Sequence, residues 1–239
     1  MKDDGDAKLT QMLTLAAQKL WEAYLAAEDD RIREVTMPAL DRFIEAVLAH
    51  DPAVWHAWGR DLAIGVSDGQ LDVPVRFPLF RRVVLPALAE GVVRGIAHCA
   101  RALASFESLL ANTPEVPLPE PLQSAVELLR EALARDPADR LARERLVERW
   151  QGYLEYTLHE LPAGVLYGRD GATIQECGEL LELLGEFRTH VAILEQEERV
   201  ADLVAECDQH FRAYRDYLQD VPRVDSYERF LEAQRSPGR

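Results

Sequence analysis

Apolar residues recur at steps of three and four along most of the chain, which is the period of an amphipathic helix. Leu9, Leu13, Leu20 and Tyr24 follow this pattern in the first predicted helix. Leu and Ala also far outnumber Val and Ile, and Leu and Ala favour helices over strands. We therefore predict an all-α fold of eight or nine helices, packed either as an irregular multi-helix bundle or as a solenoid-like array.

Prolines and capping residues indicate where these helices start and break. Pro38 and Pro86 should bend or restart their helices, because proline lacks the amide hydrogen of the helical bond. Residues 65–77 lack the helical period and predict a loop or a short hairpin, after which Pro78 opens a helix whose apolar positions run to Leu110. In the second half we predict helices near residues 121–135, 137–160, 173–194 and 196–219, and a short one after Asp225. Four start signals support these predictions and consist of Asp51-Pro52, Asp136-Pro137, Thr173 with Glu176, and Asp225 with Glu228.

The densest run of prolines predicts the main division of the chain. Residues 112–121 contain four prolines in ten positions, which is typical of an extended, semi-rigid connector. We predict an N-terminal bundle over residues 1–111, this connector, and a C-terminal bundle over residues 122–239. The connection at residues 161–172 is longer and richer in glycine than two antiparallel helices require.

The net charge of the chain limits the classes of partner that it is expected to bind. Asp and Glu number 42 against 27 Lys and Arg, which gives a net charge of −15. Such a field opposes nucleic-acid phosphates and anionic membranes, so we expect a protein partner of basic character, no nucleic acid and no membrane. The N-terminus lacks the pattern of a secretion signal, and the three cysteines lack zinc-finger spacing. We therefore expect a cytoplasmic protein with reduced thiols.

A Glu-x-x-x-His pattern occurs once on each of three successive predicted helices. Residues four apart share one helical face, so each pair can direct a carboxylate and an imidazole at one point. Three such helices can build a metal centre in a bundle, although the pattern is also that of ordinary helix-stabilising pairs or half-buried histidines. The six candidate ligands are Glu155, His159, Glu186, His190, Glu206 and His210.

Two further features are candidates for partner binding. Glu179, Glu182 and Glu186 have the spacing of a negatively charged stripe on one helical face. The glycine-rich connection offers a possible contact surface because loops on rigid scaffolds often carry function. Its candidate residues are Tyr167, Arg169 and Asp170.

No pattern of a nucleophilic triad, a phosphate-binding loop or a zinc finger is present in the sequence. The leading hypothesis is therefore a non-catalytic interaction protein, such as an adaptor or an immunity-type inhibitor, with no cofactor. One alternative is a helical-bundle metalloprotein that holds a transition metal with its Glu and His pairs. Another alternative is a ligand-sensing regulatory domain with a pocket between its halves.

Overall fold

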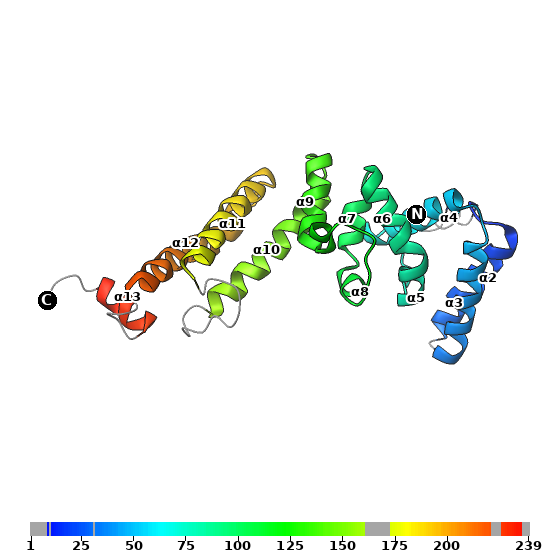
Figure 1. Cartoon of the computed structure of the whole chain (residues 1–239), viewed down its shortest axis with the longest axis horizontal. Coiled ribbons are helices and arrows are strands. Elements are labelled where there is room, and N and C mark those ends of the chain that lie inside the picture. The colour runs from blue at the N-terminus through cyan, green and yellow to red at the C-terminus, as the bar shows by residue number, and fades with distance from the viewer. Residues whose placement is uncertain (1–8, 10, 31, 161–172, 221–225, 236–239) are drawn as a thin grey trace. The chain divides into compact units, whose positions relative to one another are not determined.

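The computed structural model describes residues 9, 11–30, 32–160, 173–220 and 226–235 (Figure 1). All regular elements in these residues are helical, and nine of the helices have seven or more residues. This confirms the predicted all-α, multi-helix fold. The chain divides into two compact units, Met1–Ala142 and Arg143–Arg239.

The first unit begins with three helices that share an aromatic core. They are α2 (Leu15–Asp29), α3 (Arg33–Leu48) and α4 (Pro52–Ser67). Each contributes one large ring to the centre, and Trp21, Phe43 and Trp58 are all buried. The ring centroids lie 4.7 Å apart for Trp21 and Phe43, and 5.3 Å apart for Phe43 and Trp58. Burial of these rings and their tilted contacts stabilise the packing of the three helices.

The start of α4 follows its capping signal, whereas α2 begins only at Leu15, after Leu9 and Leu13, and α3 has no side-chain cap. The Asp51 side chain accepts a hydrogen bond from the Ala53 amide, and Pro52 occupies the first helical position, as predicted. Helix α3, however, runs without a restart through Pro38. Proline near the N-terminal end of a helix interrupts few bonds, and burial of Phe43 and Ile44 on the same helix favours its continuation.

A non-helical segment joins α4 to the next group of helices. It contains no strand, so the loop alternative is the one observed for residues 68–76. Leu71 packs so closely on Gly65 that a side chain there would clash, which explains a glycine inside α4. Three elements then follow without a gap, namely α5 (Phe77–Leu79), the π-helical turn η1 (Phe80–Val84) and α6 (Leu85–Arg94). The wide turn immediately precedes Pro86, where the missing amide interrupts the α-helical bonding pattern, as predicted.

The prediction of one helix from Pro78 to Leu110 is wrong. Helix α6 ends at Gly95, whose φ of 70° is left-handed, and His98 has a φ of 64°. Glycine adopts this conformation without strain and so terminates the helix. The chain restarts as α7 (Cys99–Ala104) and α8 (Glu107–Ala111). Val93, near the end of α6, is 66% exposed.

The residues between the proline-rich segment and Ala142 belong to the first unit. The turn η2 (Glu120–Gln123) and α9 (Ala125–Arg135) follow the prolines, and α9 packs against α7. The division along the chain falls within the following helix, α10 (Arg140–Glu160), after Ala142. Residues 112–142 thus fold with the N-terminal helices, although the prolines suggest a boundary at 112–121. The division into bundles at 1–111 and 122–239 with a connector at 112–121 stays a prediction.

A buried ion-pair network ties three elements of the first unit together. Arg101 on α7 is only 3% exposed. Its guanidinium donates to Asp68, which follows α4, and its Nε donates to Asp139 Oδ2 at 2.9 Å. Asp139 also accepts from the Ala142 amide at 3.0 Å and so caps α10, a role that the sequence pattern gives to Asp136. We name Arg101, Asp68 and Asp139 the buried Arg101 network.

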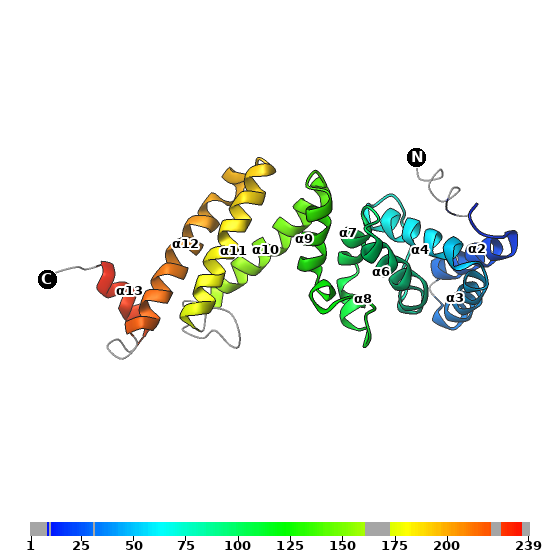
Figure 2. The same ribbon diagram turned by 45° about the horizontal axis from the view of Figure 1, so that its top comes forward.

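The helices of the second unit match the predicted elements within about three residues, the largest difference being the start of α10 at Arg140. Besides α10 this unit contains α11 (Ile174–Ile193), α12 (Glu197–Asp220) and α13 (Tyr227–Arg235). Helices α11 and α12 lie side by side (Figure 2). Phe187 from α11 and Phe211 from α12 are fully buried, and Trp150 of α10 is 2% exposed. The heptad-like apolar spacing therefore predicts the buried faces of these helices correctly.

Replacement of Asp139 by Asn should destabilise the protein by about 3 kcal/mol at pH 7, because it leaves the buried Arg101 with one carboxylate instead of two. Burial alone would raise the pKa of Asp139, but the Ala142 amide and the Arg101 charge together lower it below its usual value. A carboxylate whose pKa is lower in the folded than in the unfolded protein stabilises the fold at pH values above its unfolded pKa of about 3.9. This stabilisation is lost as the pH falls through the folded pKa. The difference in the free energy of unfolding between the wild type and Asp139→Asn should therefore be largest above about pH 5 and should shrink below about pH 4.

Urea denaturation at several pH values measures this difference in the free energy of unfolding. The matched control is Asp41→Asn, which removes an exposed carboxylate from α3. Equal stability of Asp139→Asn and Asp41→Asn at pH 7 would contradict the structural role of the buried Arg101 network.

Candidate functional site

The orientation of α11 is fixed at its first turn by a capping box. The Glu176 amide donates to Thr173 Oγ1 at 3.2 Å, and the Thr173 amide donates to Glu176 Oε2 at 2.9 Å. From this start, Leu180, Leu184 and Phe187 fall on the buried face of the helix. The opposite face is therefore directed to solvent.

The exposed face of α11 is acidic over three turns. Glu179, Glu182 and Glu186 are all exposed, as their spacing indicates. Glu179 accepts a hydrogen bond from Gln175 Nε2 at 3.0 Å, one turn earlier. Ile193 lies at the end of this face and is 57% exposed. We name Gln175, Glu179, Glu182, Glu186, Thr189 and Ile193 the α11 acidic face.

The segment that contains the α11 acidic face and the start of α12 carries little positive charge. Residues 173–208 contain ten acidic residues and two arginines. Arg188 lies 3.6 Å from an Asp208 carboxylate oxygen, and Arg199 donates to Gln151 Oε1 at 2.8 Å. Both arginines thus have partners inside the unit, and the segment keeps an excess of negative charge. Tyr167, Arg169 and Asp170, the other partner-binding candidates, lie outside the residues that the structure describes.

Two of the three Glu-x-x-x-His pairs line one shared depression. Glu155 and His159 come from α10, and Glu206 and His210 come from α12. The depression has a volume of about 630 Å³ and is also lined by Arg235 of α13. Glu155 accepts a hydrogen bond from Gln151 Nε2 at 2.8 Å. The i, i+4 spacing thus brings these four groups to the same part of the surface.

The third pair lies elsewhere in the second unit. Glu186 and His190 are not among the residues that line the depression. The His190 ring packs edge-on against Trp150 with centroids 5.4 Å apart. Its Nδ1 lies 2.8 Å from Arg143 Nη1. Arginine only donates, so this nitrogen accepts the bond and its lone pair is occupied.

Side chains that line the depression already have hydrogen-bond partners, and this limits which ligands they can bind. His210 Nδ1 lies 3.0 Å from the Tyr227 hydroxyl, which also donates to the His210 carbonyl. Only Nε2 of this imidazole is left for a ligand. Within the described ranges, no three His, Cys, Asp or Glu side chains are grouped so that they can hold a metal ion. The metal centre stays a prediction, with His159 and His210 as its strongest members.

The cysteines do not add soft ligands or nucleophiles to this surface. Cys99, Cys177 and Cys207 are all buried free thiols. Burial raises the pKa of Cys207 to about 12 and the pKa of Cys99 and Cys177 to about 11. A thiol with such a pKa stays protonated at neutral pH and is a poor nucleophile.

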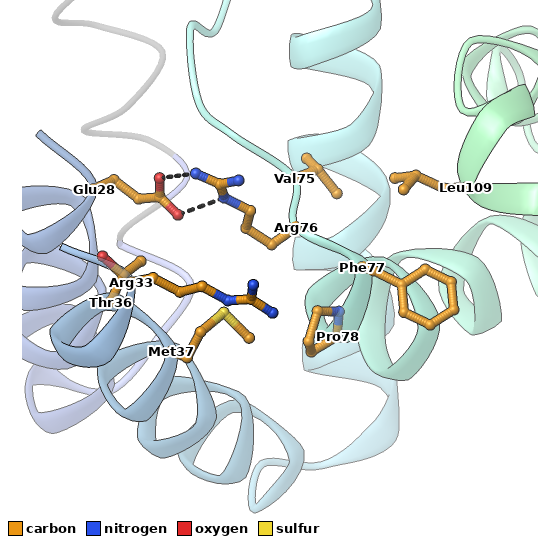
Figure 3. A pocket seen from close by; sticks show the side chains of 9 residues that line it. All are labelled: Glu28, Arg33, Thr36, Met37, Val75, Arg76, Phe77, Pro78 and Leu109. Carbon is orange, nitrogen blue, oxygen red and sulfur yellow. Dashed lines mark hydrogen bonds and ion pairs between the residues drawn. The ribbon is translucent and has the colours of Figure 1, made fainter. Parts of the chain in front are cut away.

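A second pocket lies in the first unit, and no sequence pattern predicts it (Figure 3). Its volume is about 670 Å³. The residues come from the end of α2, the first turns of α3, the segment before α5, α5 itself and α8, so no local spacing could group them. They are Glu28, Arg33, Thr36, Met37, Val75, Arg76, Phe77, Pro78 and Leu109.

No protein-family model matches the chain, and no curated protein or solved structure matches it significantly. In the described part of the chain, none of the helices combines the length and apolar character needed to cross a bilayer. The function must therefore be argued from these surfaces alone.

The buried thiols should be unreactive in the native protein. At pH 8 a chromogenic disulfide reagent should modify fewer than one of the three cysteines within minutes, because their thiolate populations are small and their sulfur atoms are covered. The same reagent in urea should report all three. Rapid modification of a single thiol in the native state would indicate an accessible thiolate and contradict the burial of all three cysteines.

Proposed function

We propose that the protein is a non-catalytic helical scaffold that binds a basic protein partner through the α11 acidic face. The observation that carries this proposal is the exposure of Glu179, Glu182 and Glu186 on one face of a well-capped helix. The helix holds the backbone of the three glutamates in fixed register, so binding of a partner requires no ordering of the backbone there. An adaptor or an inhibitor of a basic enzyme is a concrete form of this function.

The charge of the whole molecule supports the same partner chemistry. A net charge of −15 attracts a cationic protein from a distance and accelerates encounter. Exposed Ile193 at the end of the acidic face offers an apolar contact that can add affinity once the charges have aligned the partner. Arg and Lys side chains on the partner are the natural complements of the three glutamates.

The second candidate is a metalloprotein centred on the depression between α10 and α12. The observation that favours it is the shared lining by Glu155, His159, Glu206 and His210. A metal there would lack Glu186 and His190 and would rely on groups that are not gathered closely in the described chain. This candidate therefore ranks below the interaction protein, and a bound metal would supply Lewis-acid or redox chemistry.

Neutralisation of the α11 acidic face should weaken partner binding. Glu179→Gln, Glu182→Gln and Glu186→Gln in one variant remove three negative charges from a solvent-exposed face, so the fold should be unaffected. The association rate for a partner captured from native lysate should fall by about tenfold at low salt, and the difference should shrink at high salt. Surface plasmon resonance at several salt concentrations measures both effects.

The matched control removes the same charge from the first unit. Glu22→Gln, Asp41→Asn and Glu115→Gln change three exposed acidic residues that are not on α11. This variant should bind almost as fast as the wild type. If the association rate falls by the same factor in both triple variants, only the overall charge matters and the α11 acidic face is not the docking surface.

The metal candidate has a separate readout. Elemental analysis of untagged protein purified without chelator should find less than about 0.2 equivalents of transition metal, because three or more ligands are normally needed for tight binding. About one equivalent, lost in a His159→Ala and His210→Ala double variant, would instead favour the metalloprotein.

A further inference from the structure

The pocket of the first unit combines an apolar wall with an exposed guanidinium (Figure 3). From this combination we propose that it binds an amphipathic monocarboxylate, such as a medium-chain fatty-acid anion. In this arrangement the carboxylate pairs with Arg33, and the hydrocarbon part lies against the apolar residues of the pocket. The proposal is independent of the α11 acidic face, which belongs to the other unit.

The apolar wall is only partly covered by the rest of the protein. Met37, Val75, Phe77, Pro78 and Leu109 all line the pocket, and each is half-buried. A hydrocarbon chain that covers them removes apolar surface from water, at about 25 cal/mol per Å². The volume of about 670 Å³ is in the range of small-molecule sites and exceeds what one short chain fills.

One of the two arginines in the pocket is already neutralised. Arg76 donates to Glu28 through Nε at 2.8 Å and through Nη2 at 2.6 Å. The Glu28 side chain is only 9% exposed. Hydrogen bonding to Arg76 holds the pKa of Glu28 below its usual value despite burial, so the pair stays ionised at neutral pH. The pair therefore presents no net charge to a ligand.

The second arginine is the group that can recognise an anion. Arg33 is exposed at the first position of α3, and the structure gives it no ion-pair partner among the residues it describes. Figure 3 shows its side chain extending from α3 into the space beside Met37 and Pro78. A guanidinium pairs with a carboxylate through two parallel hydrogen bonds.

The remaining polar groups restrict the ligand to a single negative charge. The Thr36 hydroxyl already donates within the unit, with Ala27 and Ile32 carbonyl oxygens as its acceptors at 2.8 and 3.1 Å. Because Glu28 neutralises Arg76, Arg33 is the one guanidinium among the described pocket residues that can pair with an anion, and the net charge of the chain opposes polyanions. A carboxylate with an apolar body satisfies these conditions, whereas a phosphate or a nucleotide does not.

Methionine-methyl NMR offers a direct test on the full chain. The protein contains three methionines, Met1, Met12 and Met37. Of the two that the structure describes, Met37 lines the pocket and Met12 does not. With ¹³C-methyl-methionine labelling, decanoate below its micelle concentration should shift the Met37 signal saturably and leave the Met12 signal in place. Met37→Leu assigns the signal by its loss. No saturable shift of Met37 up to about 1 mM decanoate would overturn the proposal.

Two comparisons test the role of the charge. Arg33→Gln should weaken decanoate binding by about tenfold, whereas Arg42→Gln, an exposed arginine of α3 outside the pocket, should leave it unchanged. Decanol, which lacks the charge, should bind wild type about as weakly as decanoate binds Arg33→Gln. Equal binding of decanoate to both arginine variants, or equal binding of decanol and decanoate to wild type, would refute recognition of the carboxylate by Arg33.

Discussion

The first unit depends on the burial of one guanidinium. Arg101 reaches the core from the short helix α7 and meets Asp68 at the end of α4 and Asp139 at the start of α10. A buried cation without partners costs several kcal/mol, so these three elements have to meet for the unit to fold. Because Asp139 both pairs with Arg101 and caps α10, the same contact holds residues beyond the proline-rich segment on the N-terminal helices.

Arginine is suited to this role, and only three of the 27 cationic residues are lysines. The planar guanidinium makes several directed bonds at once, as Arg101 does with two carboxylates and Arg76 does with Glu28. These pairs place positive charge inside or between elements of a unit. The acidic excess is left on the surface, where the α11 acidic face is its most regular part. Internal ion pairing and the proposed docking surface are thus two consequences of one charge pattern.

The histidines show how packing decides between structural and chemical roles. His190 and His210 both follow a Glu by four residues, yet they occupy different surroundings. His190 packs on Trp150 and accepts from Arg143, whereas His210 contacts Tyr227 and lines an open depression. Identical local spacing therefore leads to one histidine that supports packing and one that stays available to a ligand. The pocket at Arg33 shows the converse, because its residues share no sequence motif and still come together in the fold.

The sequence determined what depends on local backbone chemistry and helical phase. The all-α class, the caps at Asp51 and Thr173, the helices of the second half and the exposure of Glu179, Glu182 and Glu186 follow from interactions within about four residues. The break at Gly95 was missed because the apolar period continues across it, and only a left-handed φ reveals the turn. Tertiary structure alone decided the partners of Arg101, the placement of residues 112–142 in the first unit, and the grouping of Arg33 with Met37 and Phe77. These contacts join residues far apart in the chain, and local spacing carries no information about which distant surfaces will meet.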